Sequence, residues 1–448
     1  MSRKYDDDFW FEDDIWADTP SKYSAGDEKP RSRTIGTDDW ALPDDDIPAS
    51  RPKKKSGGVL PLLLLLVAGF FLARSLFGTD DPVPTTLPTD SGQVIQTQTT
   101  PTPAPNATPT PKPTPTPAPA VQTGSRYFYR RLTADQKQIY TQVFQCLREM
   151  NPNVSGIRVT NAEELDTIMK AVYWDCAELF WYDGAYSYTY YDRNGYWDVT
   201  VTPVYVWDKA TAMSNKAYVE STTASLIQQL QGRSDYAKVK GVYDYLIDRT
   251  AYNYSHMNTT IHELLRDRKA VCEGYARATQ YLLTKLGVEC IYVVGNSRNE
   301  SHAWNIVNVD GLYYQLDTTW GDPLNDDGSQ TKNYGYLLIT DEECRREHTA
   351  DWAIYPTCTS TYHNYFAYEG NYLQSYDMAT LKQWAAEADR NGVPLTFKMS
   401  SKALYDECIR RLISGKEMWD MLDGLYTPGT TAYHTKYDQM YILTFTWE

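Results

Sequence analysis

One cysteine in this sequence has surroundings that suit nucleophilic chemistry. Cys272 stands in RKAVCEGYARATQYLL, between a polar run and a helical pattern that reaches a plausible stop at Gly287. We therefore expect the cysteine at the first turn of a helix, where unpaired N–H groups and the positive end of the helix dipole stabilise a thiolate. The same N–H groups can hold an oxyanion. The alternative interpretation is a small, buried and inert cysteine.

A reactive thiol needs a base, and the chain has six histidines. His302 is distinguished from the others by the segment that follows it. Five of the six lie in polar segments or near the C-terminal strands without an obvious partner: His256, His262, His348, His363 and His434.

The segment SHAWNIVNVDGLYYQLDTTW, residues 301–320, predicts a β-hairpin. It alternates on both sides of the pair Asp310-Gly311, which favours a tight turn. If that pair forms the turn, five side chains share one face: His302, Trp304, Gln315, Asp317 and Thr319. His302 and Asp317 then become diagonal neighbours within side-chain reach, and a carboxylate so placed orients an imidazole. A bulge in the hairpin would change this parity.

These segments also carry a family resemblance. In this order and spacing, AVCEGYARA, HAWNIV and LYYQLDTTWGDP resemble the core of the transglutaminase-like superfamily of papain-like thiol enzymes, over roughly residues 235–325. The resemblance implies that Cys272 is the nucleophile, His302 the base and Asp317 the orienting acid. It further implies a cysteine-bearing helix packed on an antiparallel sheet. One departure is Ala270, where many relatives have glycine. The flanking segments resemble extracellular relatives from Gram-positive bacteria.

The implied reaction is acyl transfer on peptide or protein carboxamides. The Cys272 thiolate, paired with protonated His302, attacks the carboxamide carbon, and water or a lysine amine then resolves the thioester. The sequence leaves open whether the outcome is hydrolysis, as in a cysteine protease or amidase, or crosslinking. The backbone N–H of Cys272 is the first expected oxyanion donor, and Tyr252 is a candidate for the second donor. No cofactor is expected.

Aromatic residues near the motifs have two interpretations. Trp304, Trp320 and Tyr252 are candidates to line a substrate groove, whereas sheet packing that shields the triad is the alternative for the two tryptophans. Asn305 is expected to make structural hydrogen bonds. The sequence NDDG at 325–328 lacks the spacing of an EF-hand, and no zinc pattern of the CxxC kind is present, so no metal site is predicted.

The remaining patterns indicate an α+β fold. Two helix starts are expected, one capped by Thr133 with Gln136 and one by Thr160 with Glu163. Strands are expected about Asn194-Gly195. Further elements are predicted as a helix from 234, a helix 377–391, strand 394–400, helix 401–414 and strand 440–447.

The N-terminal third reads differently from the rest of the chain. Residues 59–77 are apolar enough to cross a bilayer as one transmembrane helix, and the basic cluster at 51–55 places the N-terminus in the cytoplasm. A signal peptide is the alternative for this segment. The Pro/Thr repeat that follows is typical of an extended stalk. The catalytic domain is thus expected outside the cell, held at the membrane.

The predicted parts are a disordered acidic tail (1–58), the span (59–77), the stalk (78–124), a helical and hairpin part (125–232), the transglutaminase-like core (233–345) and a C-terminal α/β part (346–448).

The net charge limits the possible binding partners, and the cysteine content limits the possible disulfides. The net charge of −15, acidic also over 125–448, argues against binding nucleic acid. The expected partners are a peptide or protein substrate, including cell-wall peptide, and the membrane, while the oligomeric state is left open. Six cysteines besides Cys272 could form three disulfides, and Cys344 with Cys358 is the first pair to test.

Three hypotheses of function follow. The first is a membrane-anchored thiol enzyme. The second is a catalytically silent module of the same superfamily that binds cell-wall or peptide ligands. The third is a scaffold whose acidic cytoplasmic tail is the working part. The presence of all three residues Cys272, His302 and Asp317 favours the enzyme.

Overall fold

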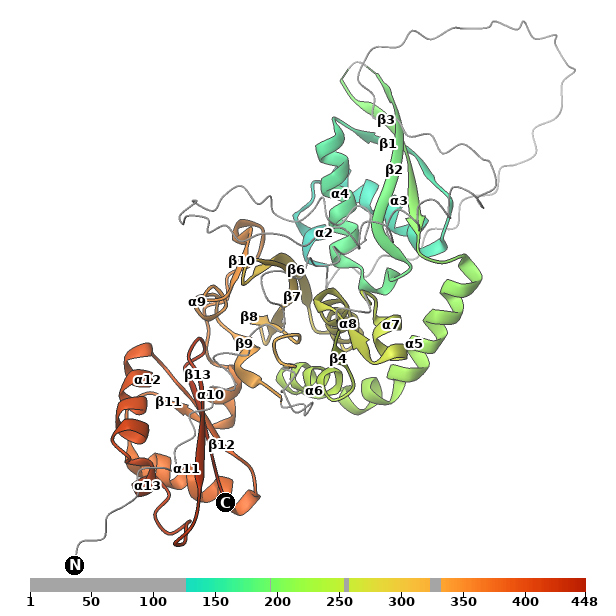
Figure 1. The fold of residues 1–448 in the computed structure, drawn as a ribbon. Helices are drawn as coiled ribbons and strands as arrows, with labels where there is room; N and C mark the ends of the chain where they lie inside the picture. The colour runs from blue at the N-terminus through green and yellow to red at the C-terminus, as the bar shows by residue number, and fades with distance from the viewer. Residues whose placement is uncertain (1–125, 194, 254–257, 323–331) are drawn as a thin grey trace, which may run out of the picture. The chain divides into compact units, whose positions relative to one another are not determined.

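The computed structural model describes residues 126–193, 195–253, 258–322 and 332–448. Helices and strands alternate along these residues and build four sheets (Figure 1). The predicted tail, span and stalk lie outside the described residues, as do Asn194, His256 and the segment 325–328. Within the described residues, no helix combines the length and the apolar character needed to cross a bilayer.

An antiparallel five-stranded sheet carries the predicted hairpin. In spatial order its strands are β10 His348–Ala350, β6 Cys290–Ser297, β7 Glu300–Val309, β8 Leu312–Leu316 and β9 Leu337–Ile339. Val309 pairs with Leu312, as the sequence predicts. Asp310 and Gly311 both have positive φ, 51° and 85°, which is the backbone conformation that a two-residue hairpin turn of this kind requires. The predicted register of the hairpin is therefore confirmed.

Helix α8, Cys272–Lys285, packs on this sheet and contacts β7 and β6. Its residues are mostly good helix formers, and the helix ends just before Gly287, which has φ 79°. Gly274 in the first turn has a packing reason: a Cβ there would lie 2.5 Å from the carbonyl oxygen of Asn258 and 2.8 Å from Cβ of Ala270. The first turn of α8 can therefore lie close to both segments only because residue 274 is glycine.

Three helices and a short parallel pair of strands adjoin α8. Helix α6 is capped by the Ser234 side chain, which accepts from the N–H of Ala237, so the helix predicted from 234 is confirmed. The elements are α5 Lys209–Leu230, α6 Asp235–Ile247, α7 Ile261–Asp267, β4 Ala251–Tyr252 and β5 Lys269–Ala270.

The N-terminal part combines helices with a three-stranded antiparallel sheet of order β1-β3-β2. Its elements are α2 Tyr127–Arg131, α3 Ala134–Glu149, β1 Val154–Val159, α4 Ala162–Asp175, β2 Tyr182–Asp192 and β3 Trp197–Tyr205. The capping box of Thr133 with Gln136 is confirmed. The cap predicted at Thr160 is wrong by one residue, because Asn161 caps α4 while Thr160 donates to Glu164. The asparagine side chain reaches the N–H of Glu164, which leaves the threonine one position outside the helix.

The C-terminal part contains a four-stranded sheet of order β11-β12-β14-β13. Its elements are β11 Tyr372–Leu373, α11 Met378–Asn391, β12 Leu395–Met399, α12 Lys402–Cys408, a π-helix Ile409–Ser414, α13 Met418–Met421, β13 Ala432–Tyr437 and β14 Ile442–Trp447. The two predicted helices and two predicted strands are confirmed. Five short elements lie elsewhere: η3 Ala177–Leu179, η4 Tyr334–Tyr336, α9 Asp341–Cys344, η5 Trp352–Ile354 and α10 Tyr365–Glu369.

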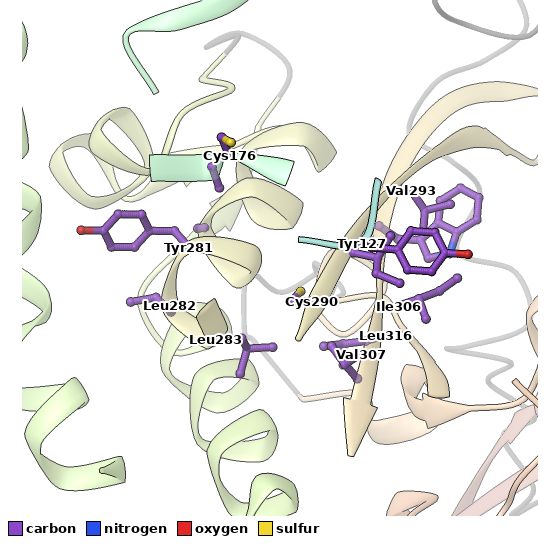
Figure 2. Packing of buried hydrophobic residues seen from close by; sticks show 14 of the residues in the cluster. Tyr127, Cys176, Tyr281, Leu282, Leu283, Cys290, Val293, Ile306, Val307 and Leu316 are labelled. Carbon is purple, nitrogen blue, oxygen red and sulfur yellow. The ribbon is translucent and has the colours of Figure 1, made fainter. Parts of the chain in front are cut away.

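Two main hydrophobic clusters stabilise the described chain. The larger one joins the N-terminal helices, α8 and the five-stranded sheet, and Figure 2 shows its members Leu283, Cys290 and Val307. The second is built from the C-terminal part, from Leu373 to Phe445. The helix with the predicted nucleophile and the sheet with the predicted base therefore belong to one packed core, which fixes their relative position.

Candidate active site

Cys272 is the first residue of α8, as predicted. The residue before it, Val271, offers no side-chain cap, so the first N–H groups of the helix remain available to a thiolate or an oxyanion by helix geometry. Cys272 is partly exposed, whereas the other six cysteines are buried. Its thiol is therefore accessible to a reagent or substrate, unlike a cysteine packed in the core.

His302 and Asp317 meet at the open end of the hairpin. His302 lies on β7, and Asp317 directly follows the last residue of β8. Nε2 of His302 is 2.7 Å from Oδ2 of Asp317. The other carboxylate oxygen, Oδ1, accepts from the backbone N–H of Trp320 at 3.0 Å. Cys272 is the second hydrogen-bond partner of the His302 side chain. The three residues named from the sequence therefore form one hydrogen-bonded series.

The electrostatics of this series favour a charged imidazole. Burial lowers the pKa of His302, but the Asp317 carboxylate and the Cys272 sulfur more than offset it and raise the pKa to about 10. Burial alone would raise the pKa of Asp317, yet two imidazoles, those of His302 and His348, hold it well below its usual range. At neutral pH the site thus holds an imidazolium beside a carboxylate, with the Cys272 sulfur next to the imidazolium.

His348 is a further member of the site that the sequence did not indicate. Its Nε2 lies 2.9 Å from the same oxygen, Oδ2 of Asp317, and its Nδ1 lies 3.2 Å from the carbonyl oxygen of Cys344. It is the first residue of β10, which pairs with β6 so that His348 is opposite Ser297. The strand is three residues long and carries no alternation, so only the pairing of β10 with β6 brings this histidine to the site.

The predicted groove residues lie around the histidine in different ways. Trp304 is 1% exposed, its ring is nearly parallel to that of His302, and its Nε1 donates to Gln315 at 2.7 Å. This burial favours the packing interpretation for Trp304. Trp320 is partly buried and meets His302 edge to face, with ring centroids 6.3 Å apart. Tyr252 lies on β4 and stacks on Tyr275 of α8.

Polar contacts tie α8 to its neighbours. Asn305 is fully buried on β7, and its amide donates to the carbonyl oxygens of Ala276 at 3.1 Å and Ile291 at 3.4 Å. The structural role expected for Asn305 is therefore confirmed. In the same helix, the Thr279 hydroxyl lies 3.0 Å from that of Thr318, one residue after Asp317. These contacts hold the cysteine helix in place against β7 and against the segment that follows β8.

Among the described residues, one group offers three ligand atoms to a metal ion: His302, Asp317 and His348. Two imidazoles and a carboxylate suit a divalent transition metal. Both imidazoles, however, direct their Nε2 atoms at a single carboxylate oxygen at hydrogen-bond distance. The three side chains are therefore satisfied by one another.

All seven cysteines are free thiols in the structure. Cys344 lies on α9 and is buried. Burial raises the pKa of the Cys344 thiol, and the nearby Asp317 and Cys358 raise it further. The pair suggested by the sequence is thus close in space but not joined.

The region that contains Cys272, His302 and Asp317 is similar to known proteins. Residues 224–318 match the model of the transglutaminase-like superfamily. The chain is similar to the kyphoscoliosis peptidases of Mus musculus, 25% identical over 152 residues, and of Homo sapiens, 24% identical over 135 residues. These alignments cover 30% and 26% of this chain but only 23% and 20% of the two relatives. A crystal structure of a TGase aligns over 30% of this chain and 44% of that chain, with 18% identity and a TM-score of 0.23.

The mixture of helices and sheets, together with the matched region, defines an α+β fold with a papain-like, transglutaminase-like core. Residues 224–318 are similar to the transglutaminase-like superfamily, and this match covers less than half of the chain. Its relatives support a function of the thiol-enzyme type.

Proposed function

We propose that this protein is a cysteine acyltransferase or cysteine protease that acts on peptide or protein carboxamides through Cys272, His302 and Asp317. The observation that carries the proposal is the hydrogen-bonded series that joins a partly exposed thiol at a helix N-terminus to a buried imidazole and a buried carboxylate. Cys272 is the nucleophile, His302 carries the proton, and the charge of Asp317 orients His302.

The reaction begins with the thiolate of Cys272, which attacks the carboxamide carbon while His302 is an imidazolium. The first N–H groups of α8 can stabilise the oxyanion that forms, and the backbone N–H of Cys272 is the expected donor. His302 then gives its proton to the leaving amine or ammonia, and a thioester with Cys272 remains. Neutral His302 accepts a proton from the incoming water or lysine amine, which resolves the thioester and restores the starting state.

The second step decides between two activities. Water gives a peptidase or amidase, and a lysine amine gives a crosslink. The names of the curated relatives, which are peptidases, support hydrolysis. The acidic balance of the chain favours basic peptides or cationic amines as partners.

The proposed place of action is the outer face of a cell membrane. The apolar run 59–77 with the basic cluster before it supports a single-pass anchor with a cytoplasmic N-terminus, and the Pro/Thr repeat supports a stalk that reaches cell-wall peptide. Extraction of membranes at alkaline pH and protease treatment of intact cells test this placement. Release of the protein by alkali, or protection of the catalytic domain in intact cells, would rule it out.

The activity test compares the wild-type protein with Cys272→Ala. Three measurements are made near neutral pH: labelling by an iodoacetamide probe, incorporation of an amine into a glutamine peptide, and hydrolysis of peptides. Cys272 should be labelled faster than the other six cysteines, and the variant should lose both labelling and turnover. Incorporation without cleavage selects a transferase, and cleavage alone selects a peptidase. Equal labelling of all cysteines would refute the nucleophile, and rapid labelling without turnover would favour a silent binding module.

A further inference from the structure

His348 contributes to the site but has no role in the steps above. Its side chain is fully buried, and it approaches Asp317 from β10, which is separated by β6 from β7, the hairpin strand that carries His302. The two imidazoles share Oδ2 of Asp317, at 2.7 Å from His302 and 2.9 Å from His348. Asp317 therefore has a second histidine partner, which the pairing of β10 with β6 brings to it.

The partners of His348 fix its hydrogen-bonding state. Nε2 faces an ionised carboxylate and Nδ1 faces the carbonyl oxygen of Cys344, and both of these oxygens can only accept. Both ring nitrogens must then donate, so the geometry describes an imidazolium. With a thiolate at Cys272 and an imidazolium at His302, the four side chains make two ion pairs and carry no net charge.

The surroundings of His348 leave it little freedom to turn away. Three aromatic rings lie around the imidazole: Trp304 at 4.9 Å between centroids, Tyr336 at 6.1 Å and Trp320 at 6.3 Å. The charged and titratable groups that face or adjoin it are Asp317, His302, the Cys344 thiol, and Glu347, whose carboxylate is paired with Arg298. Asp317 is thus the carboxylate to which His348 donates, since Glu347 is engaged elsewhere.

We propose that His348 is a positioning residue, which holds Asp317 as an oriented carboxylate throughout the reaction so that Asp317 can in turn orient His302. This inference rests on the proposed function. In the acylation step His302 gives up its proton, and Asp317 loses the positive charge of one partner. His348 keeps its proton at that moment because it has no route to the leaving group, so Asp317 stays charged and in place until His302 is protonated again.

A metal ion is the competing explanation for two imidazoles beside one carboxylate. A metal would require the lone pairs of both Nε2 atoms to converge on a common point. Instead both ring nitrogens satisfy hydrogen-bond geometry toward Oδ2 itself. A metal there would also occupy His302 and remove it from acid–base chemistry.

The test uses the full-length protein in detergent and three variants. His348→Leu removes both donors, His348→Gln keeps an N–H for Asp317, and His363→Gln is the control. His363 is also a buried histidine with a hydroxyl and a carboxylate as partners, Tyr314 and Asp310, but these lie outside the site. We expect His348→Leu to lower kcat by roughly 10- to 100-fold with little change in KM, since a misplaced catalytic group costs about that much. We expect His348→Gln to recover most of that loss and His363→Gln to match the wild type. A kcat of His348→Leu within twofold of the wild type would overturn the proposal, as would equal losses in both His348 variants.

A second measurement does not depend on catalysis. In protein labelled with ¹⁵N-histidine, the resonance that disappears in His348→Gln should show hydrogens on both ring nitrogens at pH 7, in the wild type and in Cys272→Ala alike. A neutral tautomer would overturn the inference even if the enzyme is active. A doubly protonated ring in a protein whose Cys272 is unreactive would instead mean that the proposed function has failed while the geometry holds. One tightly bound zinc ion per chain, lost in His348→Leu, would also overturn the inference in favour of a metal site.

Discussion

Replacing Asp317 by asparagine should destabilise the protein by an amount that depends on pH. The substitution keeps the shape of the side chain and removes its charge. In the wild type, burial lowers the pKa of His302 but Asp317 and Cys272 raise it to about 10, against an ordinary value of 6.5. Since a factor of ten in protonation is worth about 1.4 kcal/mol, this difference amounts to about 5 kcal/mol of stability when the histidine is charged in both folded and unfolded states.

The sign of the pH dependence follows from linkage. A group whose pKa is raised on folding gives its full stabilisation below the unfolded value, near 6.5, and loses it as the pH rises toward 10. The lowered pKa of Asp317 reports the same interaction from the other partner, so it sets the lower limit of the pH window: the stabilisation is present above about pH 4, where the unfolded carboxyl ionises, and is lost as the pH falls. The loss caused by Asp317→Asn should therefore be about 3–5 kcal/mol at pH 6 and should shrink to about 1 kcal/mol near pH 10.

Urea unfolding at pH 6, 8 and 9.5, followed by tryptophan fluorescence, measures this loss. Asp377→Asn is the matched control, because Asp377 is an exposed helix cap and asparagine caps equally well. The same Asp317→Asn protein should lose activity on the order of 10³- to 10⁴-fold, since an asparagine does not hold the imidazole in its required form. A destabilisation that stays constant or grows between pH 6 and pH 9.5 would refute the charge argument.

Two further predictions concern the supports of the site. Lys398 of β12 is buried, and its Nζ lies 2.5 Å from Oε1 of Glu343 on α9. Lys398→Met should lower the free energy of unfolding in urea by about 3–5 kcal/mol, because it leaves the buried charge of Glu343 unpaired. The double variant Lys398→Met with Glu343→Leu should recover most of that loss, and a double variant less stable than the single one would contradict this account. Gly321→Ala would place a Cβ 2.0 Å from Oη of Tyr243. This clash should lower the free energy of unfolding by about 1–3 kcal/mol, and it should slow the labelling of Cys272. Adding Tyr243→Leu, which removes the clashing atoms, should make the pair less destabilising than the sum of the two single changes, and simple additivity would show that the contact is not responsible.

The central part of the site could be predicted because its geometry is local. The pair Asp310-Gly311 fixes the turn, and from the turn the pairing follows residue by residue to Asn305 and Leu316. Asp317 comes next in the chain, and His302 lies three residues before Asn305 on β7. The start of α8 at Cys272 likewise follows from the change of pattern at that residue. In each case the information lies within about 20 residues, where alternation and helical periodicity are reliable signals.

The remainder depends on contacts between distant segments. His348 reaches Asp317 only because a three-residue strand pairs with β6, about 50 residues earlier in the chain. Helix α5 was missed because it is polar nearly all round: only five of its 22 residues are buried. The cap of α4 was displaced by one residue because Thr160 and Asn161 are both good capping residues, and which one starts the helix is decided by how the chain leaves β1.

The burial of the other cysteines makes the labelling experiment decisive. Burial raises the pKa of every one of these six thiols: Cys146, Cys176, Cys290, Cys344, Cys358 and Cys408. For Cys408 the value reaches about 12, so at neutral pH only about one molecule in 10⁵ carries that thiolate. Alkylation requires the thiolate and access to solvent, and these six offer neither. Rapid labelling of the native protein can therefore come only from Cys272, whereas slow labelling throughout would mean that the helix N-terminus and His302 do not activate it.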